Sequence, residues 1–242
     1  MHRTTTLAAA AAIFGLVSSQ DTSSIGTTAS VGNLDWPNIT IQSISFSGNG
    51  CPQGAAKLVA GNEAGQSHVS FARVFPAQAK GANPGQWLHF NVDSFNVSIG
   101  PGIEASERTK NCQAHLNLLY PQNVVVAATA ALTRGYGHLD DGVSASWFST
   151  YFYSQDAGLT TTTQKTIQGG GDWAHSRPFR RLDAVPDVSR VWSPCGANAI
   201  LNANVRISLT SGLSNATGAI SLADSSQRYN VGLRLDWKPC ER

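Results

Sequence analysis

Charged side chains are scarce in this chain of 242 residues. Asp, Glu, Lys and Arg make up 13% of it, against about 25% in an average soluble protein. The formal net charge of +2 falls to +1 if a leader containing Arg3 is removed. Nucleic-acid binding usually requires a concentrated basic face, and the local cluster of Arg177, Arg180 and Arg181 is typical of solvated surface on a loop. We therefore expect no nucleic-acid partner.

Long apolar runs are also missing. No segment approaches the roughly 18 apolar residues in a row that indicate a membrane-spanning helix. The chain begins with MHRTTT, LAAAAAIFGLV and SSQ, the basic, apolar and small-residue order of a secretory signal peptide. We expect a signal peptide over residues 1–19, cleaved after Ser19, and a flexible Ser/Thr/Gly-rich lead-in over residues 20–38. The mature protein is expected to be secreted and extracellular, with no membrane span.

Standard catalytic and cofactor signatures are absent. The sequence has no G-x-S-x-G, no H-E-x-x-H and no G-x-x-x-x-G-K-[ST]. The cysteines and histidines show no zinc-binding spacing. We expect no metal and no cofactor, and a non-catalytic protein is favoured. An enzyme stays possible in principle, because glycosidases need only two carboxylates that leave no spacing rule in a sequence.

What the chain does contain is a series of short strand-like runs separated by Gly, Pro, Asn and Asp. The runs cover 39–46, 68–75, 87–99, 112–120, 124–133, 143–154, 159–167, 200–210, 218–223 and 229–237. No amphipathic helix is present to connect parallel strands. The pattern predicts one all-β domain over residues 39–242, an antiparallel, jelly-roll-like β-sandwich of about ten strands. Residues 168–187 hold three glycines and two prolines and are expected to form a long irregular connection.

Four cysteines occur, at 51, 112, 195 and 240. An even number in a secreted chain favours two disulfides, and three pairings are possible. The sequence contexts favour Cys51 with Cys112 and Cys195 with Cys240, because each pair joins a Gly/Pro-flanked turn to a strand or strand end. The stretch KNCQAHLNLLYPQ alternates from Cys112 onward, so we expect Cys112 on the packed side of a strand.

Three sequons fit a secreted glycoprotein. Asn38, Asn96 and Asn215 each begin an N-x-S/T triplet, which is the acceptor for N-glycosylation.

Two places hold candidate catalytic side chains. In RGYGHLDDG, alternation puts Tyr136, His138 and Asp140 on one strand face, where an imidazole beside a carboxylate could move protons. The alternative is that Asp-Asp-Gly only makes a turn. Asp93 is expected in a strand, either as a general acid or cation ligand, or as a structural aspartate paired with Lys110 or Arg108.

Aromatic residues offer a candidate ligand platform. Trp147, Tyr151 and Tyr153 share one parity in VSASWFSTYFYS. If they face outward, sugar rings could stack on them; if they face inward, they fill the core. Trp173, between a glycine run and a basic segment, is the aromatic residue that we most expect to be exposed.

Six segments together resemble a known family. They are NGCPQG, DSFNVSIGPG, KNCQAHLNLLYP, RGYGHLDDGV, VWSPCGANAILN and LDWKPC. In this order they resemble the fungal secreted proteins catalogued as domain of unknown function 4360, over residues 39–240. The resemblance implies a secreted, β-rich domain with two disulfides, and it supplies no catalytic residues. Residues 62–86 are longer than is typical, and 168–182 are more basic and aromatic.

Three functions are compatible with these features. The first is a non-catalytic extracellular protein at the fungal surface or a host interface, effector-like, with a cell-wall glycan or a host surface as its partner. The alternative is a cell-wall polysaccharide-active enzyme that uses Asp93 and Asp140 as its paired carboxylates. A structural wall component is the third.

Overall fold

The computed structural model describes residues 39–58, 69–70, 86–222 and 230–241. They belong to one compact unit, residues 35–242. The expected signal peptide, the lead-in and the sequon at Asn38 lie outside the described residues, so they stay predictions. No helix in the described part of the chain is long and apolar enough to cross a membrane.

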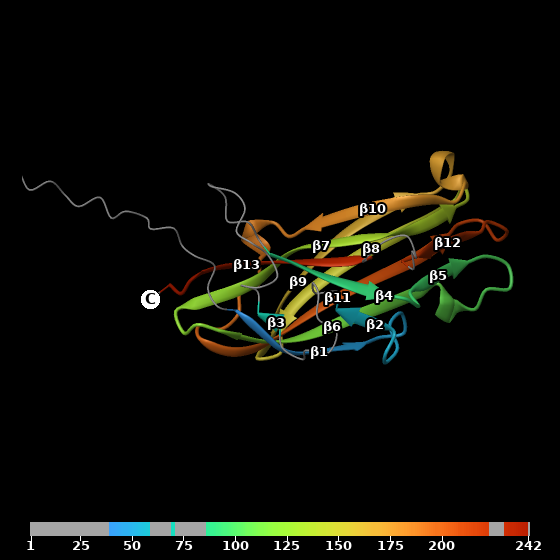
Figure 1. Ribbon diagram of the computed structural model, residues 1–242. Coiled ribbons are helices and arrows are strands. Elements are labelled where there is room, and N and C mark those ends of the chain that lie inside the picture. The colour runs from blue at the N-terminus through green and yellow to red at the C-terminus, as the bar shows by residue number, and fades with distance from the viewer. Residues whose placement is uncertain (1–38, 59–68, 71–85, 223–229, 242) are drawn as a thin grey trace, which may run out of the picture. The chain divides into compact units, whose positions relative to one another are not determined.

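Two antiparallel sheets make up the described chain (Figure 1). In the six-stranded sheet the order is β3-β1-β6-β11-β8-β9. Its strands are β1 (Thr40–Ser47), β3 (Val69–Ser70), β6 (Thr109–Tyr120), β8 (Val143–Tyr153), β9 (Asp156–Gln168) and β11 (Ala197–Ser211). This sheet contains the long alternating runs of the sequence.

In the seven-stranded sheet the order is β2-β4-β13-β7-β12-β5, and β10 pairs with β7. Its strands are β2 (Ala56–Leu58), β4 (Gln86–Val92), β5 (Asn96–Ile99), β7 (Val124–Leu139), β10 (Arg177–Ala184), β12 (Gly218–Ser221) and β13 (Val231–Pro239). Three short 3-10 helices complete the elements: η1 (Ala105–Glu107), η2 (Gly171–Ala174) and η3 (Asp187–Ser189). The predicted antiparallel β-sandwich is confirmed.

The core follows from strand alternation. Every second residue of β8 is buried along its whole length, and in β6 Ala114, Leu116, Leu118 and Tyr120 are buried while the residues between them are not. Successive side chains of a strand point to opposite faces. In β6 and β8 the apolar parity therefore meets the other sheet and the opposite parity meets solvent, whereas β7 is buried at every position from Val124 to Thr133.

The alternative of an outward platform at Trp147 and Tyr151 is wrong. Trp147, Tyr151 and Tyr153 are each at most 2% exposed. Their parity also contains Val143 and Ala145, whereas the opposite parity contains serines and threonines. Burial of the apolar parity releases more apolar surface from water, so the aromatic residues fill the core. The Tyr153 hydroxyl donates to Val126 O at 2.7 Å.

Residues 168–187 contain a strand, which corrects the expected irregular connection. β10 pairs with β7 from Arg177↔Gly137 to Ala184↔Ala130. Pro178 is tolerated because β10 lies at the edge of its sheet. The glycines serve only the short link before it: Gly170 has φ +83°, and a Cβ there would lie 1.7 Å from Asp141 Oδ1.

The arginine cluster lies on strand β10 and not on a loop, and one of its members, Arg181, is largely buried. Arg181 forms two hydrogen bonds to Asp183, at 2.9 and 3.1 Å, and their side chains are 11% and 4% exposed. The Arg181 guanidinium also lies 4.8 Å from the centre of the Trp147 ring. An ion pair in such a place requires this kind of hydrogen bonding, because desolvation of both charges is costly.

Two disulfides hold the elements, as predicted. Cys51 is bonded to Cys112 and Cys195 to Cys240, with Cα–Cα distances of 5.2 and 5.8 Å. The pairing is the one that the sequence contexts favour. The first bridge fastens the turn after β1 to β6, and the second connects the segment before β11 to the end of β13.

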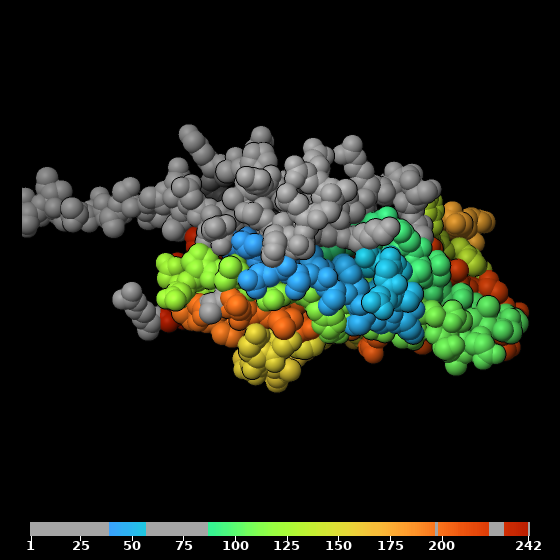
Figure 2. All heavy atoms as spheres, turned by 60° about the horizontal axis from the view of Figure 1, so that its bottom comes forward, coloured from blue at the N-terminus to red at the C-terminus, as the bar shows by residue number. Residues whose placement is uncertain are grey.

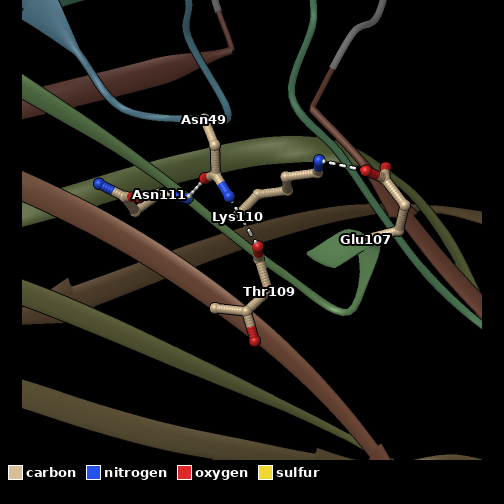
Figure 3. A network of polar contacts seen from close by, with 5 residues as sticks. All are labelled: Asn49, Glu107, Thr109, Lys110 and Asn111. Carbon is tan, nitrogen blue, oxygen red and sulfur yellow. Dashed lines mark hydrogen bonds and ion pairs between the residues drawn. The ribbon is translucent and has the colours of Figure 1, made fainter. Parts of the chain in front are cut away.

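Asn49 strengthens the first attachment by acting as a backbone mimic (Figure 3). Its Oδ1 accepts from the Asn111 amide at 2.8 Å, and its Nδ2 donates to Thr109 O at 3.1 Å. Lys110, between them, pairs with Glu107 at 2.8 Å. The expected pairing of Lys110 with Asp93 is therefore wrong, since Lys110 has a carboxylate from η1 beside it.

Removal of the bridge between Cys195 and Cys240 should cost about 4 kcal/mol in the free energy of unfolding, because it closes a loop of 45 residues. The double variant Cys195→Ser/Cys240→Ser should show this loss in urea unfolding. An unfolding midpoint equal to that of the unaltered protein would contradict the role assigned to this bridge.

Candidate functional site

His138 and Asp140 meet, as the sequence predicted, but through a third residue. Asp140 Oδ2 accepts from the Thr217 amide at 2.8 Å and from its hydroxyl at 2.7 Å. His138 Nε2 lies 3.2 Å from the same hydroxyl and 4.0 Å from Asp140 Oδ1. The hydrogen bonds from Thr217 lower the pKa of Asp140. This arrangement ties the turn after β7 to the segment before β12.

Asp93 lies away from this group. It occupies the turn between β4 and β5, which corrects the expected strand position, and it is exposed. Its Oδ1 accepts from Asn91 Nδ2 at 2.8 Å. Asp93 precedes the first residue of β5, whereas Asp140 follows Leu139 at the end of β7. Leu139 is level with Ile99, the last residue of β5, because both pair with Gly218 of β12. The length of β5 therefore separates the two aspartates. The length of β5 alone is about 10 Å at the usual rise of a strand.

Trp173 lies in η2, where it is half-buried. Its ring packs on Phe179 with centroids 6.2 Å apart, and the Arg177 guanidinium lies 5.5 Å from its centre. Arg177 also pairs with Asp172 at 2.9 Å. Trp173 therefore covers the edge of the core and keeps part of its ring in solvent, so its role as a ligand contact stays a prediction.

The sequons at Asn96 and Asn215 both place their asparagine in solvent. Asn96 begins β5 and Asn215 lies in the link between β11 and β12, and both are exposed. Glycosylation at these positions stays a prediction that their exposure permits.

A large surface of uncharged polar side chains lies on the outer face of the six-stranded sheet. We call it the polar face and define it by four rows of cross-strand neighbours from β6, β11, β8 and β9. The rows are Thr109-Ser208-Ser146-Thr166, Asn111-Arg206-Phe148-Gln164, Gln113-Asn204-Thr150-Thr162 and His115-Asn202-Phe152-Thr160. These rows contain no carboxylate and a single cation. Figure 2 is turned toward this sheet, with the blue β1 in front and the yellow turn between β8 and β9 below it.

Asn202 is the centre of the hydrogen bonding on the polar face. Its Oδ1 accepts from His115 Nδ1 at 2.7 Å and from Gln113 Nε2 at 3.2 Å. Its Nδ2 donates to Ser154 Oγ at 2.8 Å. Asn202 is only 2% exposed although it points away from the core. Four side chains of the face and its margin are thus held in fixed rotamers.

His115 is held from both sides. Because Asn202 Oδ1 only accepts, Nδ1 of His115 carries the proton, and Nε2 then accepts from Ser47 Oγ at 2.8 Å. This chain of hydrogen bonds runs from β1 through β6 to β11. The imidazole is therefore a structural link in the face, since both ring nitrogens have partners.

Hydroxyl pairs connect the remaining strands. Thr109 and Ser208 lie 2.8 Å apart, Ser146 and Thr166 2.8 Å, and Thr150 and Thr162 2.9 Å. Such cross-strand pairs stabilise a sheet by a few tenths of a kcal/mol each. They also orient the hydroxyl groups before any ligand arrives.

Two aromatic rings interrupt the hydroxyl and amide groups. Phe148 and Phe152 are both half-buried on the polar face. The Arg206 guanidinium lies 4.2 Å from the centre of the Phe148 ring, within cation-π distance. Phe152 is the cross-strand neighbour of Asn202 on β11 and of Thr160 on β9.

The chemistry of this face suits a ligand rich in hydroxyl groups. Amides and hydroxyls both donate and accept, so they can match a sugar hydroxyl in either sense. The apolar faces of pyranose rings can lie on phenyl rings. The hydrogen bonds within the face reduce the side-chain entropy that binding would otherwise cost.

The sequence alone does not single out this site. His115, Asn202 and Phe152 all lie at the solvent parity of strands that it identified. The usable signal was the alternation in QAHLNLL and ILNANVRIS, where Gln, His, Asn and Arg fill the positions between the apolar residues.

Comparison with known proteins agrees with the resemblance. The family model described as "Domain of unknown function (DUF4360)" matches residues 77–240. The chain belongs to this family. An "Uncharacterized secreted protein" of Arthroderma benhamiae is 30% identical over 210 residues, which are 86% of this chain and 75% of the relative. The protein is secreted. The secreted relative and the two disulfides both support this conclusion.

One solved structure that aligns with this DUF4360 chain is "TmCBM61 in complex with beta-1,4-galactotriose". The alignment covers 81% of this chain and 88% of the other, with 11% identity and a TM-score of 0.23. A similarity of this size carries no argument about the site.

The pH dependence of stability should reveal the Asp140–Thr217 contact. The pKa of Asp140 is lower in the folded protein than in the unfolded chain. Its contribution to the free energy of unfolding is therefore present above the unfolded-state pKa and is lost as the pH falls through the folded-state pKa. Thermal unfolding of the unaltered protein and of Asp140→Asn should therefore differ most near neutral pH and converge under acid conditions. Asp141→Asn is the matched control. A difference independent of pH would contradict the assignment.

Asn202→Ala should lower the free energy of unfolding by about 2 kcal/mol, because it removes several hydrogen bonds from a buried amide. Asn204→Ala, one position along the same face with a single 3.5 Å contact to Asn111, should cost less than about 0.5 kcal/mol. Urea unfolding measures both. Equal losses would show that Asn202 has no central role.

Proposed function

We propose that this secreted protein is a non-catalytic glycan-binding protein, and that its polar face binds an uncharged cell-wall polysaccharide. The observation that carries the proposal is the four-row array of oriented amides and hydroxyls with two half-buried phenyl rings. At a strand spacing near 4.8 Å, the array extends over roughly 14 Å by 20 Å. That area accommodates an extended glycan chain.

The charge of the face selects the class of partner. A protein or nucleic-acid partner would normally be matched by complementary charges. The four rows offer one guanidinium, which already lies on the Phe148 ring. A neutral polymer loses little by contact with such a surface, whereas a charged partner would find few counter-charges.

The geometry does not favour the hydrolytic alternative. Glycoside hydrolysis requires two carboxyl groups within about 5 to 10 Å, one of them with a raised pKa. Asp93 precedes the start of β5, whereas Asp140 follows Leu139 of β7, which is level with the other end of β5 across β12. The pKa of Asp140 is lowered by its hydrogen bonds from Thr217, which is the wrong direction for a general acid.

Phe152→Ala should weaken retention on the insoluble polysaccharide that the protein binds by roughly three- to tenfold, since an aromatic contact contributes about 0.5 to 1.5 kcal/mol. A pull-down with chitin, β-glucan and cellulose measures it. The control is Tyr136→Ala, which removes an aromatic residue 40% exposed on the other sheet. Equal retention of these two variants, or release of reducing ends by the unaltered protein, would contradict the proposal.

Trp173→Ala belongs in the same pull-down as the rival aromatic. If the polysaccharide stacks on Trp173 of η2, Trp173→Ala will lose retention and Phe152→Ala will keep it. We expect Trp173→Ala to have the smaller effect, because its ring already packs against Phe179 and Arg177.

A further inference from the structure

A separate cleft opens on the outer face of the seven-stranded sheet. Its volume is about 370 Å³, within the range of roughly 300 to 1,000 Å³ that is usual for small-ligand sites. The apolar void between the sheets, beside Phe46 and Tyr151, is about 30 Å³ and too small for such a ligand. The cleft and the polar face lie on different sheets.

The hollow arises from one row of cross-strand neighbours. Trp87 pairs with Arg234, Arg234 with Ala130, and Ala130 with Ala184. The small side chains of the two alanines form the floor of the cleft, and the large side chains of Trp87 and Arg234 form one of its walls. The segment from Pro186 to Arg190, with η3, forms the other side.

Two polar groups at the cleft have no partner among the described residues. Thr129 is 3% exposed and its hydroxyl makes no hydrogen bond there. It lies at the bulge where β7 shifts register against β13. Nε of Arg190 is likewise buried without a partner, although its Nη2 contacts Asp187. A buried donor without an acceptor is costly, so such groups point to a ligand or ordered water.

We propose that this cleft binds a carboxylated sugar, such as a hexuronate unit of an acidic polysaccharide. The guanidinium of Arg190 supplies the charge and the planar donors that suit a carboxylate. Arg234, which is paired with Asp236 at 3.5 Å, presents a second guanidinium on the opposite wall. The Trp87 indole offers a surface for the pyranose ring, and Thr129 and Asp187 can bond its hydroxyls. The inference goes beyond the proposed function, since site and ligand are both different.

Calorimetric titration with digalacturonate tests the proposal, and uncharged galactobiose is the comparison ligand. Digalacturonate should bind at least tenfold more tightly than galactobiose, and more weakly as salt is raised. Arg190→Gln should weaken binding at least tenfold. Thr129→Val, which keeps the side-chain shape and removes an unpartnered hydroxyl, should weaken it several-fold without loss of thermal stability.

The matched control is Arg180→Gln, an exposed arginine of β10 that does not line the cleft; it should bind as the unaltered protein does. The proposal fails if digalacturonate does not bind, if Arg190→Gln and Arg180→Gln bind alike, or if sulfate competes as well as the sugar. Retention on neutral polysaccharides is a separate readout. Its loss would overturn the proposed function and leave this inference standing.

Discussion

A strand with one face in water buries only every second side chain, and this constraint determines what the six-stranded sheet presents to solvent. In β6, β8 and β11 one parity is filled with apolar residues, so the sandwich packs around Leu116, Trp147 and Leu201. The side chains of the other parity face water and need hydrogen-bond partners there. In this protein amides and hydroxyls bond one another across the strands. The polar face is thus the necessary counterpart of the core.

The few charged side chains are also distributed unequally between the two sheets. Its one ion pair of largely buried side chains, in the described part of the chain, joins Arg181 to Asp183 at the edge strand β10. The polar face has only Arg206 as a cation. The cleft gathers Arg190 and Arg234 on the other sheet. One side of the sandwich therefore presents uncharged amides and hydroxyls, and the other presents two guanidinium groups, each beside an aspartate.

Much of the fold was predictable because alternation is a local property of the sequence. The runs at 112–120, 143–154 and 200–210 became β6, β8 and β11 with the expected inward parity in β6. β10 was missed because Pro178 within it and the preceding glycines suggest a loop, and only its pairing with β7 makes it a strand. The parity of Trp147 was open because both parities of that run carry aromatic residues.

The sites were less predictable than the strands, for a physical reason. The polar face depends on which residues of four strands become neighbours. The sequence of one strand does not determine its register against a strand that is distant in the chain. The cleft depends on two alanines in one row and on a bulge at Thr129. His138 and Asp140 were found because they are close in sequence, yet the Thr217 that joins them lies 77 residues beyond Asp140.

Chemical-shift mapping with soluble oligosaccharides of an uncharged cell-wall polysaccharide tests the central claim most directly. Binding at the polar face predicts shifts for the amide protons of β6, β11 and β8 and for the side-chain amides of Gln113, Asn202 and Asn204. Shifts confined to the seven-stranded sheet or to η2, or no shifts with any neutral oligosaccharide, would contradict it.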